Sequence, residues 1–225
     1  KGKKIIMIAE NLQSIKEQLP SEVNLVAVSK FHSVEEIMEA YNAGQRVFGE
    51  SRPQELAKKV SALPQDIEWH FIGHLQTNKL KMVLPYASLV QSVDSLHLLE
   101  AVNAWGVANS KRIDILLELH IGAEQTKQGF TEEEILDLCF RASSFKGVRF
   151  CGLMGMATNT DNEEDIRADF TRISDYMAYL KDLFPEMEAF KELSIGMSGD
   201  WQIALDYGAT MVRIGTAIFG PRVSA

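Results

Sequence analysis

The chain has 225 residues, of which 46% are hydrophobic and 24% charged, an ordinary globular mixture for one large domain or two small ones. Its 23 Lys and Arg against 31 Asp and Glu give a net charge of −8, with no basic block beyond Lys1 to Lys4, which argues against nucleic acid as a partner. No apolar run approaches the roughly 20 residues that span a bilayer, so no membrane association is expected either.

The first 20 residues predict an amphipathic helix. Its apolar residues recur at helical spacing and lack the continuous core of a signal peptide. They are Ile5, Ile6, Ile8, Ala9, Leu12, Ile15 and Leu19.

Cysteine usage indicates the compartment. The only cysteines are Cys139, in a helical pattern, and Cys151, in a strand pattern. Two buried thiols in a reducing environment are the expected arrangement, so the protein is predicted to be cytoplasmic.

Beyond the first helix, strand and helix patterns alternate along the chain. Apolar runs typical of buried strands lie at about 24–30, 45–50, 68–73, 88–93, 112–121, 148–156, 192–198 and 211–215. Helical patterns lie near 33–43, 52–62, 76–83, 95–108, 131–145, 161–184 and 199–207. Ser33, Thr131 and Ser198 are predicted helix caps, and Pro53 suits a first helical turn.

This alternation predicts an α/β fold, a compact (β/α)₈ barrel. The main alternative, a doubly wound open sheet, usually has a glycine-rich turn after its first strand, and residues 28–33 contain no glycine. No linker or change of composition marks a boundary, so residues 1–225 are expected to form a single domain in which residues 1–20 are the extra helix. Catalytic and binding groups of such a barrel lie where its strands end.

Lys30 ends the first apolar run, Asn24-Leu25-Val26-Ala27-Val28-Ser29-Lys30. Alternate residues of a strand share a face, so Lys30 is expected to point the same way as Val26 and Val28. Burial lowers the pKa of an amine, and a neutral amine forms Schiff bases with carbonyl compounds. The alternative is a lysine at a strand end that extends its charge into solvent.

The last two strand ends predict a phosphate site. Ser198 and Gly199 follow the seventh strand, and Gly215 and Thr216 follow the eighth, where they can open a short helix. Barrels often bind a phosphate between these two loops. The alternative is that these residues serve only as turn and cap residues.

Arg213 lies within the last strand, on the face shared by Met211 and Gly215. A buried arginine keeps its proton and must find an acceptor, either a carboxylate or the ring nitrogen of a cofactor. A Schiff-base lysine, a phosphate site and an arginine facing a ring nitrogen together describe one ligand, pyridoxal 5′-phosphate (PLP).

Several motifs give the chain a resemblance to the pyridoxal phosphate homeostasis family, in that family's order from residue 24 to residue 220. They are Ala27-Val28-Ser29-Lys30, Phe48-Gly49-Glu50, Trp69-His70-Phe71-Ile72-Gly73, Leu75-Gln76-Thr77-Asn78-Lys79, Gly152-Leu153-Met154, Ser194-Ile195-Gly196-Met197-Ser198 with Asp200, and Val212-Arg213-Ile214-Gly215-Thr216-Ala217-Ile218-Phe219-Gly220.

The resemblance implies the amino-terminal barrel of alanine racemase without that enzyme's second, β-rich domain. It implies that Lys30 forms the Schiff base, that Ser198, Gly215 and Thr216 hold the phosphate, and that Arg213 faces the pyridine nitrogen. Arginine there keeps the ring unprotonated and a poorer electron sink, which suits a carrier or a narrow enzyme.

The chain departs from the family pattern at two positions. Ser51 stands where the family commonly has Asn, which could donate to the phenolic oxygen of PLP, and the shorter Ser puts that contact in doubt. His74 stands where the family often has Pro, and it is either a proton carrier at a strand end or a solvated loop residue.

Other candidates are open to simpler interpretations. Met154 is a candidate to line the cofactor, although it shares a strand face with Met156 and core packing is the alternative. Glu50 either pairs with a nearby lysine or finishes its strand. His70 and His74 straddle a strand end, where i and i+4 do not converge, so no metal site is expected.

The leading hypothesis is a protein that buffers or delivers PLP, with PLP-dependent apoenzymes as candidate partners and a monomer as the expected state. It is not expected to have catalytic activity of its own. A racemase is the alternative, but racemisation needs two bases, and none of the tyrosines falls at a predicted strand end. They are Tyr41, Tyr86, Tyr176, Tyr179 and Tyr207. A third hypothesis, a cofactor-free sugar-phosphate enzyme that uses Lys30, leaves Arg213 harder to explain.

Overall fold

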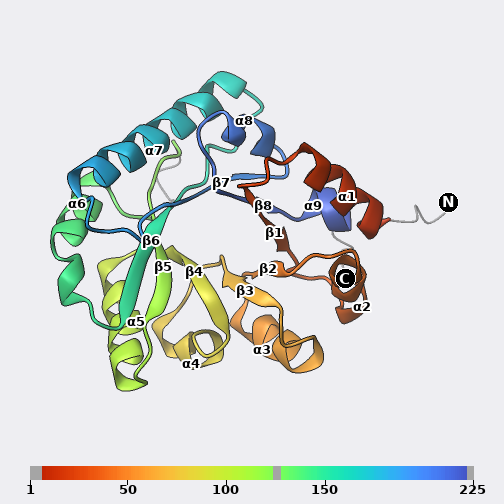
Figure 1. Ribbon diagram of the computed structural model, residues 1–225, viewed down its shortest axis with the longest axis horizontal. Coiled ribbons are helices and arrows are strands. Elements are labelled where there is room, and N and C mark those ends of the chain that lie inside the picture. The colour runs from red at the N-terminus through yellow and green to blue at the C-terminus, as the bar shows by residue number, and fades with distance from the viewer. Residues whose placement is uncertain (1–6, 124–127, 222–225) are drawn as a thin grey trace.

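The computed structural model describes residues 7–123 and 128–221, which form a closed barrel of parallel strands surrounded by helices (Figure 1). In this part of the chain the eight strands follow one another around the barrel in sequence order, and β8 pairs with β1 to close it. The predicted (β/α)₈ barrel is therefore confirmed. The open-sheet alternative is excluded because such a sheet would leave two unpaired edge strands.

Strands and helices alternate along the chain as predicted. The strands are β1 (Asn24–Val28), β2 (Val47–Glu50), β3 (Glu68–Phe71), β4 (Ala87–Val93), β5 (Ile113–Glu118), β6 (Val148–Met154), β7 (Glu192–Met197) and β8 (Met211–Ile214). The α-helices are α1 (Ile8–Gln18), α2 (Val34–Asn42), α3 (Pro53–Ala62), α4 (Leu80–Val83), α5 (Leu96–Ala108), α6 (Glu132–Phe140), α7 (Glu163–Leu183), α8 (Trp201–Leu205) and α9 (Thr216–Phe219). Two 3₁₀ turns are η1 (Thr77–Lys79) and η2 (Ala142–Ser144).

The strands bury both faces, which explains why they appear in the sequence as nearly continuous apolar runs. Leu25 and Ala27 of β1 belong to the large apolar cluster that includes the surrounding helices. Val26 and Val28 alternate with them and are also buried. A second, smaller cluster fills part of the barrel interior and consists of Leu89, Leu116, Cys151, Met154 and Met211.

Local capping signals were predicted correctly for two helices. The Ser33 hydroxyl accepts a hydrogen bond from the Glu36 amide, and the Glu36 carboxylate accepts one from the Ser33 amide, which makes a capping box. Thr131 and Glu134 form the same reciprocal pair at the start of α6. Pro53 occupies the first turn of α3, as expected.

Several predicted elements are shorter than expected. The helix predicted at 131–145 ends at Phe140, and the chain then tightens into the 3₁₀ turn η2, a common way for a helix to finish. The helix predicted at 76–83 is likewise a 3₁₀ turn followed by a single turn of α-helix. Ile5 and Ile6, assigned to the first helix, lie outside the described residues.

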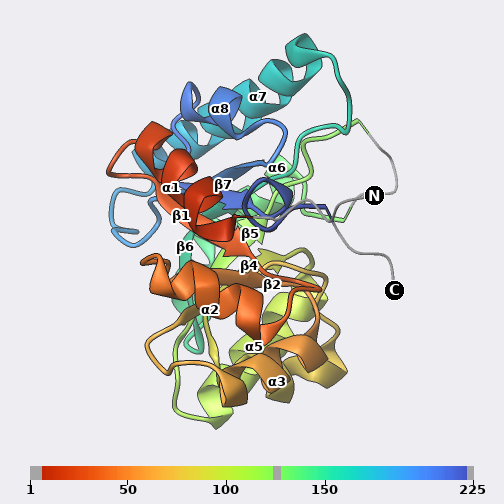
Figure 2. The same ribbon diagram turned by 90° about the vertical axis from the view of Figure 1, so that its right-hand side faces the viewer.

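The extra helix α1 lies against α2 and α9 on one side of the barrel (Figure 2). Ile8, Leu12 and Ile15 form its buried face. The Asn11 side-chain amide donates a hydrogen bond to the Ile218 carbonyl at 3.0 Å, so α1 also supports α9. Within residues 7–123 and 128–221, no helix combines the length and apolar character needed to cross a membrane.

Candidate functional site at the carboxyl ends of the strands

The residues singled out at strand ends lie at one end of the barrel, which we call the mouth. All eight strands of the described chain run parallel, so their carboxyl ends meet at this end. Lys30 follows β1, Ser51 follows β2, Ser198 follows β7 and Gly215 follows β8. The fold therefore brings together residues that are far apart in the sequence.

Lys30 lies two residues beyond the end of β1. The strand was predicted to run to residue 30, but it ends at Val28, and Lys30 is half-buried in a turn. The turn is tight, since the His32 amide donates a hydrogen bond to the Ser29 carbonyl at 3.1 Å and Phe31 has a left-handed φ of 68°. The direction of the Lys30 side chain is thus set by the turn rather than by strand alternation.

The loops after β7 and β8 are joined by one hydrogen bond. Ser198 was predicted to cap the next helix, but α8 begins at Trp201 with Asp200 at its N-cap position. The Ser198 hydroxyl instead accepts a hydrogen bond from the Gly215 amide at 3.2 Å. Thr216 opens the short helix α9, as predicted. Hydroxyl and amide groups of both loops therefore meet at the predicted phosphate position.

Asp200 completes the β7 loop. Its carboxylate accepts a hydrogen bond from the Met197 amide at 2.5 Å, and burial raises its pKa above the usual range. Beside it a cavity of about 380 Å³ opens between the loops after β6 and β7, lined in part by Met156, Thr158 and Gly199. Apart from Gly199 and its two chain neighbours, no heavy atom of the described residues lies within 4 Å of the position where a Cβ on Gly199 would be, so the backbone there borders open space.

Arg213 lies in the barrel interior, where β1 pairs with β8 and Val26 is its direct neighbour. Its guanidinium donates to the Ser194 carbonyl at 2.8 Å, the Ser194 hydroxyl at 2.6 Å and the Gly155 carbonyl at 3.0 Å. Burial lowers its pKa to about 10, while Glu118 and Asp200 favour the charged form. Arg213 is thus protonated at neutral pH and is held mainly by neutral oxygens rather than by the carboxylate that was considered.

The hydrogen bonds continue from Arg213 across the barrel interior. The Ser194 hydroxyl donates to the Gln91 side-chain oxygen at 2.6 Å, and the Gln91 amide nitrogen lies 2.9 Å from Nδ1 of His70. All four side chains are buried, and we call this set (Arg213, Ser194, Gln91 and His70) the Arg213 relay. Gln91 could not be recognised as a site residue from the sequence, because a polar residue in an apolar strand has no local partner that would reveal it.

The other predicted residues take different places. Ser51 is half-buried just after β2. Met154 is 1% exposed and packs in the interior cluster with Cys151 and Met211, which is the core role considered as its alternative. Its contact with a cofactor stays a prediction.

His74 is partnered at the mouth rather than simply solvated. Its Nδ1 lies 3.0 Å from a carboxylate oxygen of Asp94, which follows β4. The His74 side chain is 51% exposed, whereas that of Asp94 is 5% exposed. An exposed imidazole held by a buried carboxylate is an arrangement that can transfer protons.

Beneath Lys30 lies a buried ionic cluster. Glu50 pairs with Lys59 of α3 at 2.7 Å, so the predicted pairing of Glu50 with a nearby lysine is observed. Lys59 itself was missed, because Lys58 and Lys59 both resemble surface residues of an amphipathic helix. Among the described residues, no group of three or more His, Cys, Asp or Glu could hold a metal ion.

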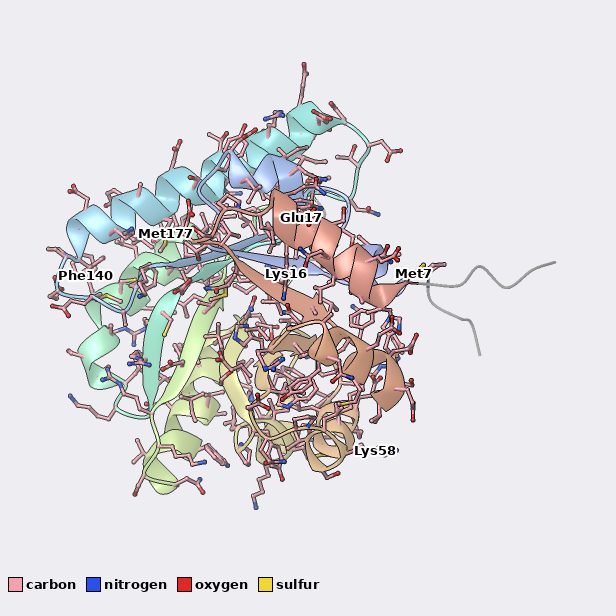
Figure 3. All side chains as sticks on the ribbon, turned by 45° about the vertical axis from the view of Figure 1, so that its right-hand side comes forward. Met7, Lys16, Glu17, Lys58, Phe140 and Met177 are labelled. Atoms are coloured by element: carbon pink, nitrogen blue, oxygen red, sulfur yellow. The ribbon has the colours of Figure 1, made fainter. Side chains whose placement is uncertain are left out.

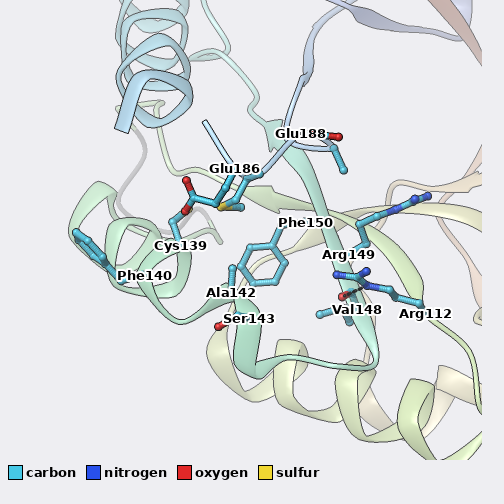
Figure 4. A pocket seen from close by; sticks show the side chains of 12 residues that line it. Arg112, Cys139, Phe140, Ala142, Ser143, Val148, Arg149, Phe150, Glu186 and Glu188 are labelled. Carbon is cyan, nitrogen blue, oxygen red and sulfur yellow. Dashed lines mark hydrogen bonds between the residues drawn. The ribbon is translucent and has the colours of Figure 1, made fainter. Parts of the chain in front are cut away.

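Larger cavities lie away from the mouth. A cavity of about 420 Å³ lies between the end of α6, the start of β6 and the segment before β7, and includes Cys139, Phe150 and Glu186 (Figure 4). Another, of about 560 Å³, includes His70, Cys151 and Met211 near the amino ends of the strands. The predicted cofactor residues Lys30, Ser198 and Gly215 line neither of them.

Comparison with known proteins assigns the family. The family model described as "alanine racemase, N-terminal domain" matches residues 6–223. A pyridoxal phosphate homeostasis protein from Schizosaccharomyces pombe is 37% identical over 219 residues, which cover 94% of this chain and 91% of that protein. The chain belongs to the pyridoxal phosphate homeostasis proteins. The resemblance seen in the motifs is therefore confirmed.

Solved structures agree with this assignment. The family member PipY of Synechococcus elongatus, solved with PLP bound, is 35% identical and superposes with a TM-score of 0.86 over 95% of this chain and all of PipY. PipY without PLP gives a TM-score of 0.90. Alanine racemase from E. faecalis is 19% identical, with a TM-score of 0.77 over 96% of this chain and 58% of that chain. That last likeness concerns the fold alone.

Proposed function

We propose that this protein binds PLP reversibly through a Schiff base on Lys30 and buffers or delivers the cofactor in the cell. The observation that carries the proposal is the meeting of Lys30, the Ser198–Gly215 contact and buried Arg213 at one end of the barrel. The family's name and the PLP-bound structure of PipY support it. As further parts of the proposal, the chain acts as one domain, as a monomer, in the cytoplasm, with PLP-dependent apoenzymes as recipients.

The residues at the mouth fit such a ligand. PLP supplies an aldehyde for Schiff-base formation, a phosphate and a ring nitrogen. The Ser198 hydroxyl accepts from the Gly215 amide and so keeps its own proton to donate to an anion, and Thr216 lies next to Gly215. Gly199 has open space on the side where a Cβ would lie, which is compatible with a ligand close to the backbone there. Lys30 lies on the neighbouring strand end, since β1 pairs with β8.

The charge of Arg213 favours a PLP carrier over a PLP-dependent enzyme. Its guanidinium is a permanent donor at neutral pH, so a ring nitrogen beside it stays unprotonated. An unprotonated pyridine withdraws electrons weakly and does little to stabilise carbanions. Arg213 therefore favours reversible binding over chemistry at the α-carbon of an amino acid.

A second candidate function, amino-acid racemisation, is favoured by His74. Racemisation needs two proton carriers on opposite faces of the substrate. Lys30 is one candidate, and the His74–Asp94 pair is a second proton-transfer group at the same mouth. An assay for interconversion of L- and D-amino acids decides between the two functions, and rapid exchange of the α-proton would favour the racemase.

The binding proposal is tested with purified protein and PLP. We expect a yellow protein, and after borohydride reduction we expect mass spectrometry to find a pyridoxyl-phosphate adduct on Lys30. Lys30→Ala should remain colourless, whereas Lys58→Ala, on the exposed side of α3, should match the wild type (Figure 3). A wild-type protein that forms no adduct on Lys30 after incubation with PLP would refute the proposal.

A further inference from the structure

The carbonyl group just before Lys30 is held by a buried lysine. Lys59 donates hydrogen bonds to the Ser29 carbonyl at 2.8 Å, to the Glu50 carboxylate at 2.7 Å and to the Glu55 carboxylate at 3.2 Å. Lys59 is 7% exposed and Glu50 is fully buried. An ammonium has three N–H groups, and each of them has an acceptor here. Lys59 is therefore fixed in place.

The amide just after Lys30 is held by the same helix. The Phe31 amide donates to the Glu55 carboxylate at 2.8 Å, and the oxygen that accepts it is the one that also accepts from Lys59. Phe31 has a left-handed φ of 68°, which a bulky residue adopts only when its surroundings impose it. Glu55 is such a constraint.

These contacts connect α3 to both peptide groups that flank Lys30. We call Ser29, Glu50, Glu55 and Lys59 the Lys59 cluster. The Ser29 hydroxyl also donates to the Glu50 carboxylate at 2.6 Å, which ties the end of β1 to the end of β2. The backbone on either side of Lys30 is thus fixed, and with it the point from which the Lys30 side chain extends.

A contribution to fold stability does not by itself explain the Lys59 cluster. Burial raises the pKa of Glu50 above its usual range, and its second carboxylate oxygen is buried with no hydrogen-bond partner among the described residues. A buried ion pair with an unsatisfied oxygen stabilises a fold less than apolar packing of similar volume. A role in orienting the neighbouring backbone accounts for such a cluster better.

We propose that Lys59, Glu50 and Glu55 are positioning residues that aim the Lys30 amine at the aldehyde of PLP. This inference rests on the proposed function, because it concerns the same Schiff base. Lys59 is not itself the reacting amine, because its three N–H groups are engaged by Ser29, Glu50 and Glu55. The positioning residues set how fast Lys30 reacts, and PLP itself touches none of them in this proposal.

Glu55 offers the sharpest test because a matched pair of variants exists. In Glu55→Gln the amide oxygen can replace the carboxylate oxygen that accepts from Phe31 and Lys59, while the amide nitrogen takes the side facing Arg52. Glu55→Ala removes both hydrogen bonds. The Glu55 side chain is 23% exposed, so both variants are expected to fold.

The measured quantity is the second-order rate constant for formation of the yellow adduct with PLP, normalised to the folded fraction. We expect Glu55→Ala to slow it by about tenfold or more, since small errors of position are costly in rate, and Glu55→Gln to stay within about twofold of the wild type. A double variant, Glu50→Gln with Lys59→Met, avoids leaving one buried charge unpaired, and it should be slowed similarly. Lys58→Met is the matched control on the exposed side of α3 and should react as the wild type does.

Three results separate the possible explanations. Equal rates in Glu55→Ala, the double variant and the wild type, with the adduct still on Lys30, would overturn the positioning role and leave the proposed function intact. A lower unfolding midpoint without a slower rate would equally overturn it, because that is what a purely structural role predicts. Absence of an adduct on Lys30 in the wild type would overturn the proposed function itself and this inference with it.

Discussion

Acidification should destabilise this fold through His70, and the Arg213 relay explains why. An arginine can only donate, so the Ser194 hydroxyl accepts from Arg213 and donates its own proton to the Gln91 oxygen. The Gln91 amide nitrogen is then the donor toward Nδ1 of His70. Nδ1 must therefore be unprotonated, and His70 is neutral with its proton on Nε2.

Burial gives the size of the effect. His70 is 6% exposed, and its desolvation lowers the pKa from 6.5 to about 4. As pH falls below 6.5, the unfolded chain takes up a proton before the folded protein does. Neutral His70 therefore contributes its full stability above pH 6.5 and loses it progressively down to about pH 4. At about 1.4 kcal/mol for each pKa unit, the loss across this window is about 3 kcal/mol.

The assay is urea unfolding of wild type and His70→Asn at several pH values between 7 and 4.5. Asn keeps an acceptor for the Gln91 amide but carries no ionisable group, so the difference between the two proteins reports on His70. We expect the unfolding free energy of the wild type to fall by about 2–3 kcal/mol more than that of the variant. Parallel pH profiles would refute the assignment of His70 as a buried neutral group.

Three further outcomes are expected. Ser198→Ala should weaken binding of PLP by about tenfold, measured by absorbance titration, since it removes the hydroxyl that joins the loops after β7 and β8, where the phosphate is proposed to bind. Gly152→Ala should lower the free energy of unfolding, measured with urea, by more than about 3 kcal/mol, because its Cβ would lie 1.8 Å from a carbonyl oxygen of β7. Gly208→Ala is the control: its φ is 76° but the space around it is open, so it should lose only about 1–2 kcal/mol. Iodoacetamide should leave Cys139 and Cys151 unmodified at neutral pH until urea unfolds the protein, since burial raises their pKa values to about 12 and about 11.

The features that were predicted correctly from the sequence, such as helix caps, depend on contacts between residues close together in the chain. The capping boxes that begin α2 and α6 join residues three apart, so the signal lies within a few letters. Ser198 had an equally plausible local role as a cap, but its hydroxyl accepts from the amide of Gly215, 17 residues away. Which of the two interactions forms is decided by where β7 and β8 end, and that is a property of the closed barrel.

Lys59 is the clearest example of a buried residue near the site that the sequence could not reveal. Lys58 and Lys59 are adjacent, identical and both on α3, yet Lys58 is exposed and Lys59 is buried. The difference arises because the face of α3 that carries Lys59 packs over Ser29 and Glu50, which come from β1 and β2. Amphipathic patterning assigns charged residues to the solvent side and so misses a charge that is satisfied by tertiary partners.

The Arg213 relay and the Lys59 cluster have the same physical character, which fits the proposed role of both in binding one ligand. Each places polar groups where apolar side chains would stabilise the barrel more; one set holds Arg213, and the other holds the backbone next to Lys30. Desolvated hydrogen bonds to a fixed donor or acceptor resist displacement, so they hold Arg213 and the backbone of Lys30 to narrow geometries. In the proposed function PLP contacts the Lys30 amine with its aldehyde and Arg213 with its ring nitrogen, so restraining both groups favours its binding. The stability of the barrel alone requires neither the Arg213 relay nor the Lys59 cluster.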